Sequence, residues 1–225
     1  MFELFYKGGF LMYPIFFCSL LAIAIFFERM FYLKSIKTST RKFGNRIADL
    51  VRKGNINFAI TACRKNFTPI SQIILAALVK HGSSRDEIKE VIEDTARHEI
   101  AALERNMPIL GTIGNITPLL GLLGTVFGMI KSFQVISVVG VGNPEALAGG
   151  ISEALLTTAF GLSVAIPTIV AYNYLSNRID RQVKEMESTS VEILELLSEN
   201  NNNSNIQFKE AQEEGVKIDE ILSHQ

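Results

Sequence analysis

The sequence predicts an all-α membrane protein with three transmembrane helices and long helical extensions outside the membrane. Three uncharged runs support this prediction: residues 8–27, 106–130 and 154–177, which are 20, 25 and 24 residues long. A helix needs about 20 apolar residues to cross the hydrocarbon layer of a bilayer. Buried core helices of a soluble protein are the alternative, but three such runs in 225 residues are rare without a bilayer.

The first uncharged run is expected to stay in the protein as a signal anchor. One lysine, Lys7, precedes it, and Glu28 and Arg29 follow it directly without a small-residue cleavage site. A cleaved signal peptide would carry such a site. We therefore assign residues 1–33 to an outer N-terminus and the first transmembrane helix.

Basic residues predict the orientation, because loops rich in Lys and Arg stay in the cytoplasm. Residues 132–152, between the second and third runs, contain no Lys or Arg. Basic residues instead follow the first and third runs: Arg29, Lys34, Lys37, Arg41 and Lys42, then Arg178, Arg181 and Lys184. The N-terminus is therefore expected in the periplasm, and residues 34–106 and the C-terminus in the cytoplasm. Residues 136–146 form a short periplasmic loop between the second and third transmembrane helices, residues 107–135 and 147–176.

The cytoplasmic segments are predicted to be helical. Ser84 stands three residues before Glu87, which is the spacing of a capping box at a helix start. Apolar residues then recur at helical spacing up to Leu103, and this helix is expected to run on into the second transmembrane helix. A shorter helix before it is expected to end at Gly82.

The C-terminal side is expected to begin as a charged helix over residues 177–199. An asparagine-rich run follows at residues 200–205, and such a polar run is typical of a flexible break. We therefore assign residues 200–225 to a flexible C-terminal tail.

The composition excludes several classes of function. The chain has 22 basic and 23 acidic residues, so nothing favours nucleic acid as a partner. Cys18 and Cys63 lie in segments of different character and form neither a disulfide framework nor a metal-binding spacing. No nucleophile with its base, phosphate loop or metal cluster is evident. We expect no enzyme activity, no cofactor and no metal.

Small residues form one seam along each of the last two transmembrane helices. Glycine costs about 1 kcal/mol against alanine inside a helix, so its repeated use implies a close approach by another helix. The spacing in the second helix alternates between three and four residues, a 3.5-residue period. The two seams are Gly111, Gly114, Pro118, Gly121, Thr125, Gly128 and Ser132, and then Ala154, Thr158, Gly161, Ala165, Thr168 and Tyr172.

Polar groups on these helices leave two interpretations open. The seams could simply hold a bundle together, or the hydroxyls of Thr125 and Thr158 and the carboxyl of Glu153 could mark an ion pathway, where intramembrane ionisable residues are often found. Glu153 could equally be an interfacial acid near a helix start. Lys131 is expected to extend toward the membrane surface, and pairing with Glu153 or Glu145 is the alternative.

The same residues carry a family resemblance. The stretches "PLLGLLGTVFGMIKSF" and "GISEALLTTAFGLSVAIPTIVAYN" resemble the ExbB/TolQ branch of the MotA/TolQ/ExbB proton-channel family, closely over residues 109–173. Flagellar stator subunits of that family have four membrane helices, so the three predicted helices of this chain favour the ExbB/TolQ branch.

The resemblance implies a homo-pentamer in the inner membrane of a Gram-negative bacterium. A dimer of an ExbD/TolR-like single-span partner would occupy its pore. TonB or TolA would transmit the mechanical work to the outer membrane. The family's pathway positions fall on Thr125, Glu153 and Thr158. A non-conducting scaffold is the alternative. A small-solute transporter is disfavoured because the three unequal helices show no repeat. The client and the choice between H⁺ and Na⁺ stay open.

Overall fold

The computed structural model describes residues 8–36, 40–140 and 144–223, and in these residues every regular element is helical. The described residues divide into two compact units. The membrane unit contains the residues up to Leu33 and Glu104–Ile179, and the loop unit contains Lys34–Leu103 and the residues from Asp180.

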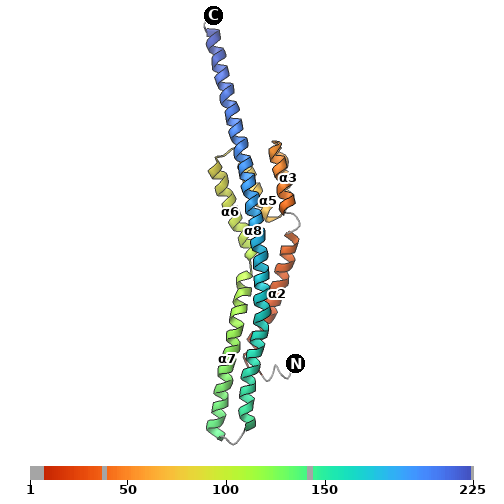
Figure 1. The fold of residues 1–225 in the computed structure, drawn as a ribbon, viewed down its shortest axis with the longest axis vertical. Coiled ribbons are helices and arrows are strands. Elements are labelled where there is room, and N and C mark those ends of the chain that lie inside the picture. Colours follow the sequence, from red (N-terminus) through yellow and green to blue (C-terminus); the bar gives the residue numbers. More distant parts are fainter. Residues whose placement is uncertain (1–7, 37–39, 141–143, 224–225) are drawn as a thin grey trace. The chain divides into compact units, whose positions relative to one another are not determined.

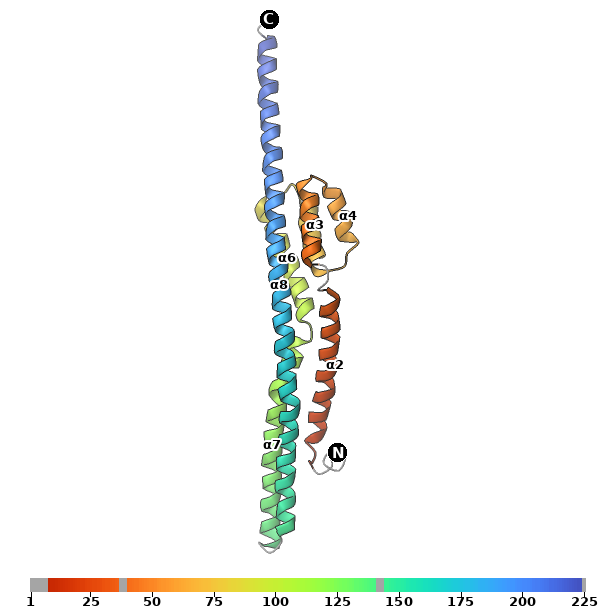
Figure 2. The ribbon, with the colours of Figure 1, turned by 45° about the vertical axis from the view of Figure 1, so that its right-hand side comes forward.

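Three helices of the described residues are long and apolar enough to cross a bilayer, which confirms the predicted count. They are α2 (Met12–Ile36), α7 (Met107–Val139) and the first part of α8 (Pro144–Ser223). Their large apolar side chains point outward: Phe17, Leu119 and Leu155 are 62%, 61% and 65% exposed. In the membrane unit α7 and α8 lie side by side and run antiparallel (Figure 1, Figure 2). A surface this apolar requires lipid or another subunit around it.

The helix before the second transmembrane helix does not continue into it, so that expectation was wrong. Helix α6 (Arg85–Glu104) ends, Asn106 takes the left-handed conformation at φ 65°, and α7 starts at Met107. The physical reason is Pro108, which has no N–H to bond the preceding turn but is tolerated in the first turn of a new helix. Asparagine accepts a positive φ better than most residues.

The side chain of Asn106 ties this break to the first transmembrane helix. Its Nδ2 donates to Glu28 Oε2 at 2.9 Å, and the other carboxylate oxygen of Glu28 pairs with Arg29 at 2.7 Å. Arg29 also stacks over the Tyr32 ring, 4.9 Å from its centroid. The charged residues that follow the first apolar run are therefore held together at one end of the membrane unit.

The loop unit is built from short helices around an apolar core. Helices α3 (Thr40–Arg52), α4 (Ile56–Arg64) and α5 (Pro69–Val79) pack on one another (Figure 2). The last part of α8 packs on α3, where Arg52 pairs with Glu192 at 3.0 Å. The core contains Ile47, Val51, Cys63, Ile70, Ile73, Ile74, Leu78, Ile88 and Ile193, all at most 1% exposed.

Local signals set the helix boundaries of this unit as predicted, with one shift. Ser84 Oγ accepts the backbone N–H of Glu87 at 3.3 Å, which is the expected cap of α6. Helix α5 ends at Val79, three residues before the predicted end at Gly82. Gly82 takes φ +90°, so it serves the turn that follows the helix.

The asparagine run does not interrupt the last helix, which differs from the sequence expectation. Helix α8 is continuous to Ser223 and passes through residues 200–205 without a break. Asparagine in a helix interior costs only about 0.7 kcal/mol relative to alanine, against about 3 kcal/mol for proline. The run contains neither proline nor glycine, so it lacks the residues that end helices most strongly.

The burial of Cys63 generates a test of this unit. Its side chain is fully covered, and burial raises the pKa of its thiol to about 12. Only the thiolate reacts, so at pH 7.5 we expect alkylation of folded Cys63 by a maleimide to be roughly a thousandfold slower than that of an exposed cysteine. The measurement is the labelling rate in a Cys18→Ala background, with and without denaturant.

The matched control for this labelling combines Cys63→Ala with Phe58→Cys, because Phe58 lies on the same helix and is 70% exposed. The control should label rapidly in the folded protein. Equal rates for the two proteins before denaturation would contradict the described core.

Candidate functional site

The centre of the candidate site is a backbone-to-backbone contact between α7 and α8. A Cβ built on Gly161 would lie 2.8 Å from the carbonyl oxygen of Thr117 and 3.1 Å from the Cα of Gly121. A Cβ built on Gly121 would lie 3.1 Å from the Cα of Thr158. Backbone atoms cannot rotate away as side chains do, so only glycine permits this separation of the two helices.

The rest of the contact follows both helices in an antiparallel register. Gly128 faces Ala154, with 2.7 Å from a built Cβ to the Ala154 Cβ, and Gly114 faces Ile169 at 2.8 Å. Gly111 faces the ring of Tyr172 at 3.2 Å. Ala154 and Ala165 are 3% and 1% exposed. The structure thus places the small residues of each helix against the other helix of the same chain.

The two threonines singled out from the sequence are half-buried, and both donate to backbone carbonyls. Thr158 Oγ1 donates to the Gly121 carbonyl of α7 at 2.9 Å, across the helix contact. Thr125 Oγ1 donates to the Leu122 carbonyl of its own helix at 2.6 Å. With its proton committed to a carbonyl, each hydroxyl oxygen retains lone pairs that can accept a hydrogen bond.

Thr157 is a site residue that the sequence reasoning missed. It is 1% exposed, and its Oγ1 lies 2.8 Å from the Gly8 carbonyl and 2.7 Å from the Glu153 carbonyl. The methyl group of Thr157 packs against Gly124, which was also absent from the predicted seam. A signal existed: Thr157 stands four residues after Glu153, on the same helix face.

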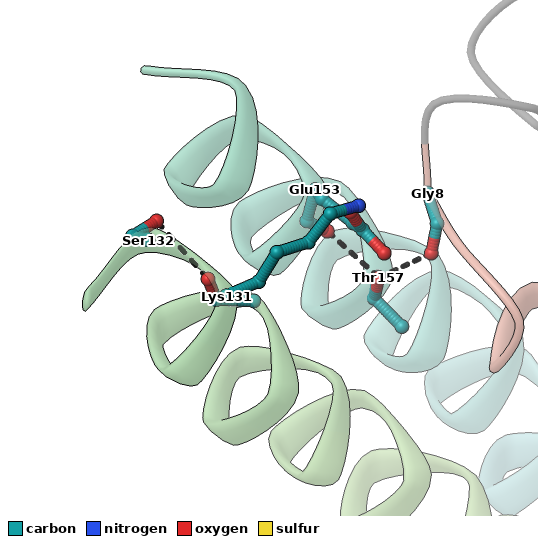
Figure 3. A network of polar contacts seen from close by, with 6 residues as sticks. Gly8, Lys131, Ser132, Glu153 and Thr157 are labelled. Carbon is teal, nitrogen blue, oxygen red and sulfur yellow. Dashed lines mark hydrogen bonds and ion pairs between the residues drawn. The ribbon is translucent and has the colours of Figure 1, made fainter. Parts of the chain in front are cut away.

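Glu153 and Lys131 form an ion pair, so Lys131 does not extend freely to the membrane surface. Lys131 Nζ of α7 lies 2.7 Å from Glu153 Oε2 of α8, and the Glu153 side chain is only 21% exposed (Figure 3). The pairing that the sequence left as the alternative is therefore present. Glu153 Oε1 lies against the backbone of Gly9, at which a Cβ would overlap it.

Charged residues mark both ends of this helix pair. In the antiparallel register Arg105 and Arg178 lie toward one end, and Lys131 and Glu153 toward the other. The uncharged residues 106–130 span about 37 Å at 1.5 Å per residue. This length exceeds the thickness of the hydrocarbon layer, which is about 30 Å.

The fold and the site define a membrane protein built on a closely packed antiparallel helix pair. The sequence model of the MotA/TolQ/ExbB proton channel family matches residues 65–188. The chain is 34% identical over 178 residues to the putative biopolymer transport protein ExbB-like 3 of Synechocystis, covering 78% of this chain and 84% of that protein. It is 30% identical over 173 residues to the Tol-Pal system protein TolQ of Haemophilus influenzae, covering 72% of this chain and 76% of that protein. The chain belongs to the ExbB/TolQ branch of the MotA/TolQ/ExbB proton channel family.

A solved structure shares the fold. The chain matches a structure described as C. jejuni MotAB with a TM-score of 0.62, covering 90% of this chain and 81% of that chain. The sequences are 19% identical, so this likeness concerns the fold alone. Among the residues that the structure describes, no group of His, Cys, Asp or Glu side chains could hold a metal ion.

The close helix contact generates a stability prediction. Gly161→Ala forces a methyl group onto the backbone of α7, so we expect it to destabilise the protein by about 1–3 kcal/mol, as overpacking does. Gly149→Ala is the matched control, because a Cβ on Gly149 meets nothing within 4 Å. The measurement is the thermal unfolding midpoint of each purified variant in detergent. Equal midpoints for the two variants would show that the α7–α8 contact is not as described.

Proposed function

We propose that this chain is the channel subunit of an inner-membrane motor driven by the proton motive force. With an ExbD/TolR-like partner it energises TonB-dependent outer-membrane transport or Tol-type envelope function. The observation that carries this proposal is the family match over residues 65–188, which contains both seam helices together with Thr125, Glu153 and Thr158.

The chemistry of the two hydroxyls suits a channel wall. Both threonine protons are donated to backbone carbonyls, so the oxygens of Thr125 and Thr158 keep lone pairs that can accept a hydrogen bond from a passing group. A protonated carboxyl on a partner helix, or a hydronium ion, can donate to such an oxygen.

The proposed assembly is a homo-pentamer around a dimer of the single-span partner. The apolar side chains that α7 and α8 turn away from each other support it, because such a surface needs a partner or lipid. Leu155, Val170 and Phe133 are 65%, 63% and 62% exposed in the single chain. Neighbouring subunits, the partner dimer and membrane lipid would cover this surface.

The proposed orientation follows the basic residues of the membrane unit. The end with Arg105 and Arg178 faces the cytoplasm, because basic residues are retained on that side. The end with Lys131 and Glu153, and with it the N-terminus, then faces the periplasm. This places a TonB-like or TolA-like transducer on the side from which the outer membrane is reached.

A non-conducting scaffold is the second candidate. Both threonine hydroxyls donate their hydrogen bonds to carbonyls of the same chain, and this favours a scaffold, because a scaffold needs no free polar group in the membrane. The two functions differ in one respect: a scaffold carries no ion current with any partner.

The channel function predicts proton flux that depends on the partner and on the hydroxyls. We expect liposomes containing this chain and its single-span partner to dissipate a pH gradient, and liposomes with this chain alone not to do so. Thr125→Val and Thr158→Val should each lower the flux at least about tenfold, since they remove an acceptor oxygen at nearly constant volume. The measurement is a pH-sensitive dye trapped inside the liposomes, repeated with a sodium gradient.

Two controls separate the hydroxyls from the packing. Thr158→Ser keeps the donor and the acceptor, so it should retain most of the flux. Ser163→Ala removes an exposed hydroxyl of α8 that bonds only its own helix at 2.7 Å, and it should have no effect. An assembled wild-type complex without flux in either gradient would support the scaffold instead.

A further inference from the structure

We propose that Lys131 is the fixed counter-ion of Glu153, and that Glu153 shapes the channel wall as half of a permanent ion pair instead of carrying the transported proton. The inference rests on the proposed channel function. Lys131 is a positioning residue here: it acts through Glu153 and through the three segments that meet at this carboxylate.

The sequence around the pair offers few other charged groups with which either side chain could pair. Residues 106–177 contain only three charged side chains, Lys131, Glu145 and Glu153, and two of these three lie 2.7 Å apart. The Glu153 side chain is 21% exposed and that of Lys131 is 64% exposed, so the carboxylate is the group that depends more on its partner for charge compensation. Removing one partner leaves the other charge uncompensated, whereas removing both does not.

The carboxylate is held on both sides. Oε2 bonds Lys131, and Oε1 lies against the backbone of Gly9, which takes φ +74°. The backbone carbonyl of Glu153 and that of Gly8 both lie within hydrogen-bonding distance of Thr157 Oγ1 (Figure 3). The pair therefore joins α7, α8 and the turn before α2 at one point.

This arrangement suits a fixed wall better than a proton carrier. A carrier must exchange partners in every cycle, whereas the Glu153 carboxylate is fixed between Lys131 Nζ, 2.7 Å away, and the backbone of Gly9. In the proposed orientation the pair lies toward the periplasmic end of α7 and α8. The hydroxyls of Thr125 and Thr158 lie deeper along the same helix pair, where they can meet a carboxyl of the partner.

The test is a set of charge variants assayed with the single-span partner in liposomes. The variants are Lys131→Gln, Glu153→Gln, the combination of both, and the reversed pair Lys131→Glu with Glu153→Lys. We expect each single variant to lose at least about tenfold in proton flux per assembled complex, because each leaves one unpaired charge. The double neutral variant should recover at least half of the wild-type flux, and Lys131→Arg should keep it.

The double neutral variant decides between the two roles. If Glu153 carries the proton, the double variant stays as inactive as Glu153→Gln, while Lys131→Gln remains active; that outcome overturns the proposal. Lys7→Gln tests whether another lysine is the counter-ion of Glu153. Lys7 directly precedes Gly8 in the sequence and lies outside the described residues. This variant should leave the flux unchanged, and a loss equal to that of Lys131→Gln would overturn the assignment.

Thermal unfolding of the same variants keeps the pair testable if the channel function fails. The single variants should unfold at lower temperature than the wild type, and the double neutral variant should regain most of the difference. If the decrease in unfolding temperature of the double variant equals the sum of the decreases in the two single variants, the pairing is overturned. A wild-type complex that shows the coupled unfolding pattern but conducts no ions refutes the channel function and leaves the ion pair in place.

Discussion

The close approach of α7 and α8 is the constraint on which the rest of the membrane unit depends. Gly121 and Gly161 bring the two backbones into contact, and no larger residue fits at that point. Lipid provides no hydrophobic drive between helices, so van der Waals contact along the glycine faces holds the pair together. The register set by this contact decides which side chains meet at every other level of the two helices.

The hydroxyl and charge positions follow from that register. Thr158 reaches the Gly121 carbonyl only because the helices touch there, and Lys131 reaches Glu153 because the same antiparallel register continues beyond this contact. Thr158 and Lys131 thus each have a partner within the chain that the bilayer could not supply. The outward faces remain apolar, which leaves them to lipid and to other subunits.

Much of the fold could be predicted from the sequence because its signals are local. Uncharged runs long enough to span a bilayer predicted the three membrane helices, and the Ser84–Glu87 spacing predicted the start of α6. Where local signals competed, prediction was weaker. The break at Asn106 depended on Pro108, and the asparagine run proved too weak a signal to end α8.

By itself the sequence determined the number of membrane helices, their small-residue seams and the residues that resemble the ExbB/TolQ branch, because composition and period act along one helix at a time. Only the tertiary structure decided which partner each residue has. Lys131 and Glu153 are 22 positions apart, and Thr157 and Gly8 are 149 apart, so no local pattern connects them. Their contacts exist because the glycine faces fix the distance and the register between separate helices.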